Sequence, residues 1–563
     1  MECREIVLDR LADESFDLLV IGGGITGAGV ALDAVSRGMR VALLERSDYA
    51  SGTSSRSTKL VHGGVRYLAQ RDITLVREAL AERQILLTLA PHLVQPQPFV
   101  LPIYRGQHVP GFMAPSVATR ALTAAGLTAY DLLAGRRRLQ GRRSLSPLGA
   151  RGLVPSLRSE GLRGAFLYYD ARTDDVRLVL AVLGAAVARG AAVANYVEVM
   201  GFEYQGGRIA GVQACDRLGR RALQIRAARV VSATGAWSQQ VSAMDGRSGR
   251  SLRLSKGVHL VIDRESLPLG PIAVVLPATA DGRLAFAVPW GNHVLIGTTD
   301  TPYEGDPAAV VPEPADVDAL LGDANRFLDL NLGRADIISA FAGLRPLIAS
   351  DATSTATTSR EHAVSVAPSG LISVSGGKLT TYRRMARDAV DAALRAKPGP
   401  WGESCTEGVL LQGAADLARR RREVQQMAAT LGLSVPIVSH LLNTYGADAS
   451  DITAIVAEAA DLGRPIVAGL PYVRAEVPYA VRREGAQSLD DILRRRTRLS
   501  LETRDGGAAA AADVSELLAA EFGWDEARRS REVAAYRERA LQSLAAWSDT
   551  STLLQFGPRP YSQ

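Results

Sequence analysis

The most regular hydrophobic pattern of the chain lies near its N-terminus. Residues 16–21 (FDLLVI) form a short apolar run, and a glycine-rich turn follows it. Residues 28–37 then have helical spacing, and residues 39–44 form a second apolar run. Short apolar runs on either side of a helical segment predict a strand, a turn, a helix and a second strand. We therefore expect the chain to begin with the first unit of an α/β domain.

Glycines separate the first apolar run from the helical segment. Gly22, Gly24 and Gly27 form a G-x-G-x-x-G pattern, and Glu45 ends the second apolar run, 23 positions after Gly22. Such glycines permit a tight turn and let the backbone approach a pyrophosphate at the positive end of a helix. A carboxylate at the end of the second strand can accept hydrogen bonds from ribose hydroxyls. The combination indicates an adenine dinucleotide as ligand.

The segment that follows favours FAD over NAD as that dinucleotide. Residues 51–66 (SGTSSRSTKLVHGGVR) are dense in hydroxyl groups and glycines, which suits a loop around a long cofactor. A polar surface loop would have a similar composition. Two later apolar runs enter glycine turns at Thr234-Gly235 and Gly376-Gly377, and such strand ends commonly return to the cofactor.

The remaining patterns predict a sheet region followed by a helical region. Gly206 and Gly207 lie between alternating apolar runs and predict the turn of a β-meander. Residues 254–301 contain several strand candidates and indicate an antiparallel, substrate-facing sheet. After the Pro-Gly-Pro at residues 398–400 the pattern is helical, with a small-residue linker at residues 506–512. The predicted fold is α/β, with an FAD-binding Rossmann-like domain, an antiparallel-sheet substrate domain and an α-helical C-terminal domain.

These patterns divide the chain into six segments that alternate between domains. Three segments are assigned to the FAD-binding domain, and the others to a connection, the substrate domain and the helical domain. In chain order they are residues 1–105 (FAD-binding), 106–150 (connection and possible membrane docking), 151–250 (FAD-binding), 251–340 (substrate-binding sheet), 341–400 (FAD-binding) and 401–563 (helical).

Composition limits the class of protein. The 563 residues are 47% hydrophobic and 22% charged, as in soluble globular proteins, and the three cysteines encode neither a zinc cluster nor a disulfide framework. No metal site is expected. The N-terminus lacks a secretory signal and the longest apolar run is too short to span a bilayer, so we expect a cytoplasmic protein. The net charge of +6 suits an acidic ligand, an anionic membrane or nucleic acid.

One segment suggests contact with a membrane surface. Residues 111–133 are largely apolar, and an arginine cluster at residues 136–143 follows them. Such a segment could lie on an anionic bilayer, where each cation contributes on the order of 1 kcal/mol. A buried helix followed by a solvated basic loop would have the same pattern.

Taken together, the motifs resemble one family, the FAD-dependent glycerol-3-phosphate dehydrogenases of the aerobic respiratory type. The resemblance implies oxidation of sn-glycerol 3-phosphate to dihydroxyacetone phosphate, with hydride transfer from C2 to flavin N5 and electron transfer to membrane quinone. It also implies a homodimer that is peripheral on the inner face of the cytoplasmic membrane. The matching motifs, in chain order, are IGGGITGAG, TSSRSTKLVHGGVRYL, DDVRLVL, SATGAW, KGVHLVI, IGTTDTPYEGDP, GLRPL, TSREH and GGKLTTYR.

The resemblance also implies which residues bind substrate. Arg66, Arg345 and Arg360 match the family's arginines around the substrate, where forked cations suit a phosphate monoester. Tyr67 is expected to add a hydroxyl to the phosphate or to pack beside Arg66. Lys378 is assigned to the substrate, the cofactor or both.

His259 in KGVHLVI is the expected catalytic base, because it matches the family motif and a histidine pKa lies near the operating pH. A satisfied histidine within the sheet is the alternative. Arg345 and Lys378 complete the expected catalytic group. The residues assigned to FAD are Gly22, Gly24, Gly27, Glu45, Thr53, Ser54, Ser55, Lys59, His62, Gly63, Gly64, Thr234, Gly235, Gly376, Gly377, Lys378, Leu379 and Thr380.

Three other functions compete with this interpretation. An oxidase of the same substrate would pass electrons to oxygen and form peroxide. A flavin-containing RNA-binding protein would need aromatic residues interleaved with the basic cluster at residues 136–143, which has none. An oxidoreductase that acts on amino acids is disfavoured because one carboxylate does not need so many cations.

Overall fold

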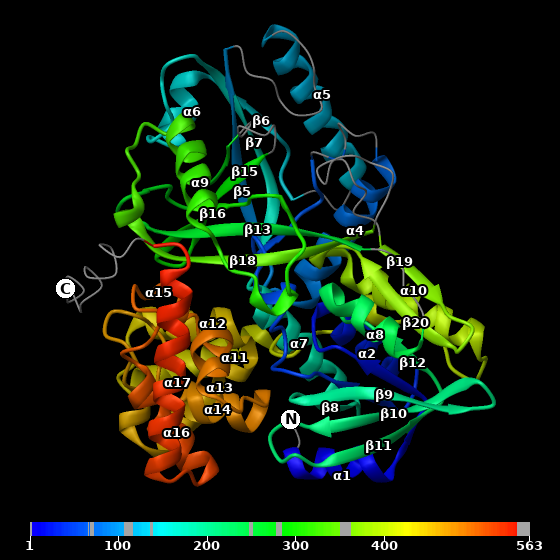
Figure 1. Ribbon diagram of the computed structural model, residues 1–563. Coiled ribbons are helices and arrows are strands. Elements are labelled where there is room, and N and C mark those ends of the chain that lie inside the picture. Colours follow the sequence, from blue (N-terminus) through cyan, green and yellow to red (C-terminus); the bar gives the residue numbers. More distant parts are fainter. Residues whose placement is uncertain are drawn as a thin grey trace.

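The predicted fold class is confirmed. The computed structural model describes residues 3–65, 67, 72–105, 116–135, 139–246, 252–276, 284–348 and 362–548, with side chains in the helix that begins at Ser116 described from residue 120. Figure 1 shows a lower α/β part that contains the N-terminus, an upper part built on a large sheet, and a helical part at the lower left.

The predicted nucleotide-binding unit is the core of the lower α/β part. Its six-stranded sheet has the order β19-β20-β12-β2-β3-β8, and only the edge strand β19 is antiparallel. Helix α2 follows the glycine turn and packs with α7 and α10. The elements are β2 (Leu18–Ile21), α2 (Ile25–Ser36), β3 (Val41–Leu44), α7 (Asp175–Val187), β8 (Ala192–Ala194), β12 (Val230–Ser232), β19 (His362–Val366), β20 (Leu371–Gly376) and α10 (Tyr382–Ala396).

The start of α2 lies very close to the end of β2. A Cβ atom on Gly27 would lie 1.8 Å from the carbonyl oxygen of Gly22, so a side chain at position 27 would force the helix away from the strand. The third glycine of the motif therefore acts through packing between helix and strand.

A smaller sheet extends this part with the predicted meander. Strands β9 and β10 are joined by a turn at Gly206 and Gly207, whose φ angles are +61° and +75°, as the sequence predicted. Helix α1 packs against this sheet. The elements are α1 (Arg4–Asp13), β1 (Ser15–Phe16), β9 (Val197–Gln205), β10 (Arg208–Asp216) and β11 (Ala222–Ala227).

The large sheet is the predicted antiparallel sheet, but it recruits strands from outside residues 251–340. Strands β5 and β7 pair antiparallel over their whole length, so both belong to this sheet and not to the six-stranded one. Strand β5 joins β14 in parallel, so the sheet is not purely antiparallel as predicted. The strands are β4 (Leu60–Val61), β5 (Gln95–Tyr104), β6 (Arg143–Leu145), β7 (Leu162–Arg172), β13 (Leu252–Asp263), β14 (Ala273–Leu276), β15 (Ala285–Trp290), β16 (His293–Gly297), β17 (Thr301–Tyr303) and β18 (Ile337–Ile348).

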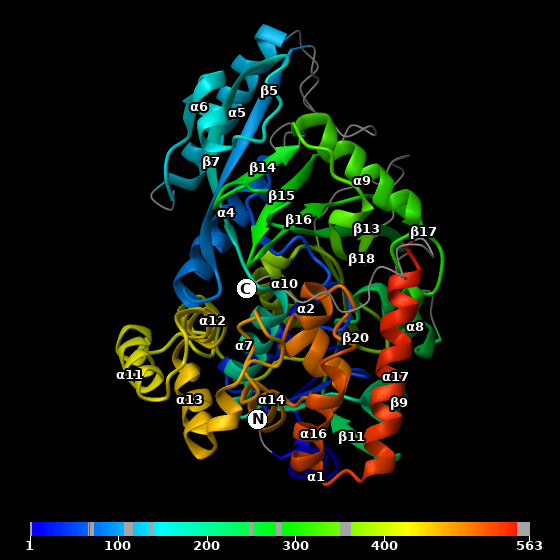
Figure 2. The ribbon, with the colours of Figure 1, turned by 90° about the vertical axis from the view of Figure 1, so that its left-hand side faces the viewer.

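Helices cover this sheet and form the end of the molecule opposite α1. Helices α5 and α6 lie at the top in both Figure 1 and Figure 2. None of the helices in the described ranges has the length and hydropathy needed to cross a bilayer. The helices of this part are α4 (Ile73–Leu89), α5 (Ser116–Ala134), α6 (Pro147–Leu153) and α9 (Pro314–Phe327).

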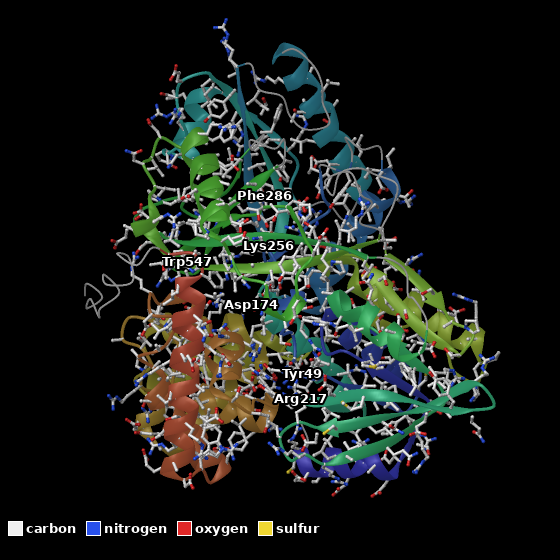
Figure 3. All side chains as sticks on the ribbon, viewed as in Figure 1. Tyr49, Asp174, Arg217, Lys256, Phe286 and Trp547 are labelled. Carbon is white, nitrogen blue, oxygen red and sulfur yellow. The ribbon has the colours of Figure 1, made fainter. Side chains whose placement is uncertain are left out.

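The predicted helical C-terminal domain packs against both other parts. Residues 506–512 are not a linker between domains, because Tyr536 donates a hydrogen bond to the carbonyl of Gly506 (2.7 Å) and the next helix begins at Ala511. Figure 3 shows Trp547 where the last helix meets the large sheet, and its side chain is buried in that core. The helices are α11 (Leu417–Thr430), α12 (Val435–Tyr445), α13 (Ala449–Glu458), α14 (Glu476–Glu484), α15 (Leu499–Glu502), α16 (Ala511–Phe522) and α17 (Glu526–Ala545).

Candidate active site

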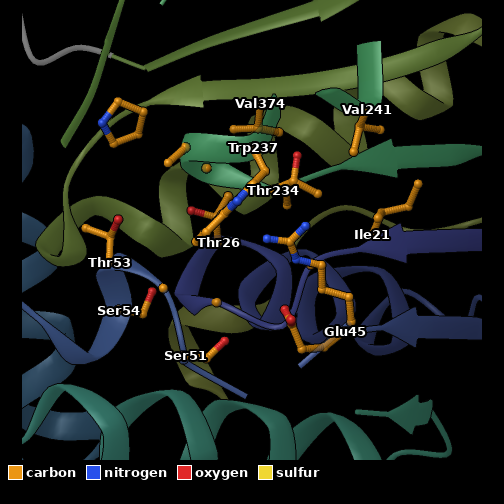
Figure 4. Close-up of a pocket in the computed structure, with 18 of the residues that line it drawn as sticks. Ile21, Thr26, Glu45, Ser51, Thr53, Ser54, Thr234, Trp237, Val241 and Val374 are labelled. Carbon is orange, nitrogen blue, oxygen red and sulfur yellow. The ribbon is translucent and has the colours of Figure 1, made fainter. Parts of the chain in front are cut away.

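The carboxyl ends of β2, β3, β12 and β20 open into a cavity of about 390 Å³. Figure 4 shows Glu45, Thr53, Ser54, Thr234 and Trp237 around it. Sequence-predicted residues from three distant segments meet here, as expected for a long cofactor. Those that line this cavity are Gly22, Gly24, Glu45, Thr53, Ser54, Thr234, Gly235, Gly376, Gly377, Lys378 and Leu379.

Backbone geometry at the glycine turn suits a pyrophosphate. Gly22 has a φ of +110°, and a Cβ there would lie 2.7 Å from the carbonyl oxygen of Ala233. No side chain caps α2 at Gly24, although Ser54 accepts a hydrogen bond from the amide of Ile25 (3.0 Å). The N-terminus of α2 thus contributes its positive end to the cavity.

Glu45 is fixed at the end of β3. Its two carboxylate oxygens accept hydrogen bonds from the amides of Gly23 (2.7 Å) and Ser47 (2.8 Å). Burial raises the pKa of Glu45, although both amides favour its ionised form. The carboxylate thereby lies beside the glycine turn and lines the cavity, where it can accept further hydrogen bonds from ribose hydroxyls.

Trp237 and Arg46 form a flat wall of this cavity that the sequence did not reveal. The Arg46 guanidinium lies 4.7 Å from the centroid of the Trp237 ring, and both residues line the cavity. A planar surface of this kind suits an aromatic heterocycle. The cavity residues therefore fit FAD: a positive helix end, a carboxylate at the end of β3 and an aromatic wall.

A second cavity of about 190 Å³ continues from the first. The two share Gly376, Gly377, Lys378 and Leu379 at the end of β20, and the second also contains His62 and Thr380. Thr380 accepts a hydrogen bond from the amide of His62 (3.1 Å), which joins these two segments. His259 and Arg345 enter this second cavity from the large sheet. The junction of the two sheets thus brings the expected catalytic residues to the cofactor cavity.

The His259 ring is held by packing and by one hydrogen bond. Its Nε2 lies 2.9 Å from Thr58 Oγ1, and the ring stacks on Phe341 with centroids 4.9 Å apart. Burial, with the positive charges of Arg345 and Lys59, holds the pKa of His259 well below its usual range. The imidazole is therefore neutral at physiological pH, which is the form a base requires. The expectation from the sequence that its pKa lies near the operating pH is wrong, because the ring is buried beside two cations.

The loop between β16 and β17 orients Arg345. The guanidinium donates hydrogen bonds to the Thr299 carbonyl (3.1 Å) and Thr298 Oγ1 (2.9 Å), and it lies 3.4 Å from Asp300. Its side chain remains 19% exposed and lines both the second cavity and a third one of about 120 Å³. Arg345 therefore presents its positive charge where these two cavities meet.

Lys378 and Tyr67 lie together at the same place. The Lys378 ammonium is 3.7 Å from the centroid of the Tyr67 ring, which lines the third cavity. Gly64 also lines that cavity. Arg345 and Lys378 thus bring two positive charges to one site. Arg66 and Arg360, the other expected substrate arginines, lie outside the described residues.

Four predicted cofactor residues line none of these three cavities: Gly27, which packs against Gly22, and Ser55, Lys59 and Gly63. Lys59 is buried against Asp175, 2.5 Å from its carboxylate. Ser55 lies beside Lys59, near the helical domain. The amide of Gly63 donates to Tyr130 Oη (2.9 Å), so this glycine is anchored within the protein. The sequence assigned Lys59 to the cofactor, but its side chain forms a structural ion pair, because the sequence carries no information on the direction of a side chain.

Several lining residues carried no assigned role in the sequence. Arg56, Thr58 and Trp237 line the described cavities, and residues 298–300 hold Arg345. All of them lie inside the motifs that carried the family resemblance, namely TSSRSTKL, SATGAW and IGTTDTPYEGDP. The motifs therefore indicated the segments that contain these residues. The spacing within a motif does not show which of its residues faces a ligand.

Known proteins identify the class of the chain. A family model described as FAD dependent oxidoreductase matches residues 17–383, and a model described as the C-terminal domain of alpha-glycerophosphate oxidase matches residues 404–529. The chain therefore belongs to the FAD-dependent oxidoreductase family, in agreement with the expected cofactor.

More specific relatives place it within that family. The glycerol-3-phosphate dehydrogenase of Mycobacterium leprae (strain TN) is 42% identical over 95% of this chain and 90% of its own length. The human mitochondrial glycerol-3-phosphate dehydrogenase is 36% identical over 95% of this chain and 74% of its own. The Bacillus halodurans glycerol-3-phosphate dehydrogenase, solved with FAD, is 33% identical, covers 97% of this chain and 99% of its own, and has a TM-score of 0.80. The chain is a member of the FAD-dependent glycerol-3-phosphate dehydrogenases, as its motifs predicted.

Proposed function

We propose that the protein oxidises sn-glycerol 3-phosphate to dihydroxyacetone phosphate. The observation that carries the proposal is the meeting of His259, Arg345 and Lys378 in a cavity continuous with the cofactor cavity. A neutral base and two cations in one place match a substrate with one reacting hydroxyl and one phosphate group. FAD, when bound, supplies the acceptor for the hydride that leaves C2, at its N5 atom.

The phosphate is bound by cations. A phosphate monoester carries close to two negative charges, and Arg345 and Lys378, which both line the second cavity, supply cations to bind it. Tyr67 orients Lys378 through the ring beneath its ammonium group. We keep Arg66 and Arg360 in the same role on the basis of the family motifs. Glycerol has no phosphate group for these cations to bind, so we expect it to be a very poor substrate.

His259 removes the proton of the C2 hydroxyl. In the free protein burial, together with the neighbouring cations, lowers the pKa of His259, so the ring is neutral and has a site for a proton. A bound phosphate dianion adds negative charge beside Arg345 and stabilises the imidazolium that forms. Substrate binding would thus raise the proton affinity of His259 at the moment when it is needed.

The electron acceptor we propose is membrane quinone, with the protein peripheral on the inner face of the cytoplasmic membrane. Leu132 on α5 and Leu148 on α6 are 75% and 85% exposed, and Arg143 is exposed as well. Exposed apolar side chains beside cations suit an anionic bilayer surface. We also propose that the protein is a homodimer, and light scattering would measure its mass in solution.

Oxygen is the alternative acceptor. The match of residues 404–529 to the C-terminal domain of alpha-glycerophosphate oxidase favours keeping this second function in view. An oxidase would form one peroxide per substrate oxidised in air. A dehydrogenase would instead reduce added quinone faster than oxygen.

An anaerobic titration tests the proposed reaction. The purified yellow protein is mixed with sn-glycerol 3-phosphate, and glycerol serves as the control. Bleaching of the flavin by the phosphate ester alone supports the proposed substrate. A spectrum that stays yellow overturns that substrate and leaves the assigned cofactor in place. Re-oxidation by quinone or by air then separates the two acceptors.

A further inference from the structure

Thr58 lies between the expected base and the cavity that Arg345 lines. Its hydroxyl is 2.9 Å from His259 Nε2, while Nδ1 of the same ring is buried and has no hydrogen-bond partner among the described residues. Thr58 and Arg345 line both the second and the third cavity, whereas His259 lines only the second among the described cavities. The His259 ring lines the second cavity, but its Nδ1 is buried and its Nε2 is bonded to Thr58, so a proton from the cavity reaches Nε2 through the Thr58 hydroxyl.

The ring itself has little freedom to turn toward another partner. It stacks on Phe341 with an interplanar angle of 11°, and Gly297 lies against its edge. A Cβ atom on Gly297 would be 2.3 Å from His259 Cδ2, so the glycine is needed for this close approach. The packing keeps Nε2 directed at Thr58.

One buried carboxylate anchors both chain neighbours of Thr58. Asp175 accepts hydrogen bonds from the amide and hydroxyl of Ser57 (3.1 and 2.7 Å), and it forms the 2.5 Å ion pair with Lys59. Lys59 itself adopts a left-handed backbone conformation, with φ of 59°. Because residues 57 and 59 are both fixed, the position of Thr58 is set independently of any ligand.

We propose that the Thr58 hydroxyl transfers the proton from the substrate C2 hydroxyl to Nε2 of His259. Thr58 Oγ1 accepts the substrate proton as its own proton passes to Nε2, so Thr58 remains neutral and His259 becomes the imidazolium. The C2–H bond breaks with its electron pair, which the hydride carries to the flavin. The step uses no reactant beyond those of the proposed reaction, and it rests on the proposed role of His259.

This assignment also explains the finding on Lys59. The ion pair with Asp175 serves as a brace for the loop that carries Thr58, and it does not serve the cofactor directly. Ser57, Lys59 and Asp175 are accordingly positioning residues. Thr58 is the member of the loop that would touch the substrate.

The test compares Thr58→Val, Thr58→Ser and Thr173→Val in the FAD-loaded protein. Valine keeps the shape of threonine but has no hydroxyl, whereas serine keeps the hydroxyl. Thr173 is the matched control. It is buried beside Lys59, and the amide of Thr173 donates a hydrogen bond to the carbonyl of Lys59 (2.9 Å). Thr173 lines none of the three described cavities. The measurement is the anaerobic rate of flavin bleaching at saturating sn-glycerol 3-phosphate, with the substrate Kd from its concentration dependence.

We expect Thr58→Val to bleach about 10²-fold more slowly with little change in Kd, since proton transfer contributes 10²–10⁴-fold to such steps. Thr58→Ser should stay close to the wild-type rate, and Thr173→Val should match it. A normal rate in Thr58→Val, or a loss that appears only in Kd, overturns the proposal. So does an equal loss in Thr58→Ser.

A His259→Ala variant separates this proposal from the proposed function. If His259→Ala is slow while Thr58→Val is fast, His259 remains the base and the Thr58 step is wrong. If His259→Ala bleaches at the wild-type rate, the assignment of the base is wrong. If both single variants are slow, the double variant should be no slower than His259→Ala, because the two residues act in one step.

Discussion

The active site has two ends, one that binds the cofactor and one that carries the expected catalytic residues, and they are formed by different parts of the fold. The cofactor end lies at the carboxyl ends of β2, β3, β12 and β20, where glycines allow the backbone to approach a ligand closely. The catalytic end is made of side chains from the large sheet and from the loop after β20, held by hydrogen bonds and ion pairs. Binding and reactivity should therefore respond to different substitutions.

The largest expected effect is at the glycine turn. Gly27→Val places a side chain where a Cβ is already 1.8 Å from the Gly22 carbonyl oxygen, so we expect no flavin-containing protein to be recovered. The 450 nm region of the purified protein's spectrum measures this. Gly152→Ala in α6 is the control, because no atom lies within 4 Å of its added Cβ. A yellow Gly27→Val protein would contradict the packing argument.

The next effect is confined to the catalytic end. Arg345→Ala should lower kcat/KM for sn-glycerol 3-phosphate by about 10²–10³-fold, because it removes a charge-assisted contact to the phosphate. Flavin content should not change, since the cofactor cavity is lined by other residues. Arg253→Ala is the matched control, because Arg253 is exposed, and it should leave kcat/KM unchanged. Loss of flavin from Arg345→Ala would show that the two ends are not separable.

The helical domain supports the cofactor end. Asp48 is buried between the guanidinium groups of Arg495 and Arg496, which lie in the π-helical turn Asp491–Arg496. Asp48→Asn removes the carboxylate that the two guanidinium groups share and leaves them only Asp491 and Glu484, so we expect unfolding to become easier by about 3 kcal/mol. Denaturant melts of the holoprotein measure this. An unchanged midpoint would mean that the domain docks through other contacts.

The ion pairs of Asp48 with Arg495 and Arg496 also predict how the stability of the fold depends on pH. Burial opposes ionisation of Asp48, but Arg496 and Arg495 outweigh it and hold the pKa of that carboxyl below its usual range. Because the folded pKa is the lower one, this contribution to stability is present above about pH 4 and is lost as pH falls further. Melting temperatures between pH 5 and pH 3 should fall less steeply for Asp48→Asn than for the wild type. Parallel curves would contradict this.

The smallest expected effect is at Glu45. Glu45→Gln keeps one acceptor oxygen for the amides of Gly23 and Ser47 but removes the charge, so we expect FAD to bind about tenfold more weakly. The bleaching rate of the fully loaded protein should stay the same. A slower rate at full loading would assign Glu45 a role beyond the cofactor end.

The cofactor end was predictable because its determinants are local. The glycine pattern and Glu45 lie within one strand-turn-helix-strand unit, and the physical reason for each residue can be stated before the fold is known. The hairpin at Gly206 and Gly207 is local in the same way, and it was confirmed.

The catalytic end depended on contacts between distant segments. The family motifs named His259 and Arg345, but no spacing shows that Thr58 bonds to His259, 201 residues away. The side chain of Lys59 pairs with Asp175 and lines none of the cofactor and substrate cavities, since a lysine can pair with a carboxylate as readily as it can bind a ligand. Likewise, β5 and β7 joined the large sheet because strand pairing is decided by long-range packing.

The most direct test of the account is anaerobic stopped-flow reduction with sn-glycerol 3-phosphate that carries deuterium at C2. If the C2 hydride passes to the flavin in this site, bleaching will be slower with the deuterated substrate than with the ordinary one. Glycerol, added in place of the substrate, will not bleach the flavin. Equal rates with both isotopologues at saturation, or bleaching by glycerol, would contradict the proposed reaction and the role of Arg345 and Lys378 in selecting the phosphate ester.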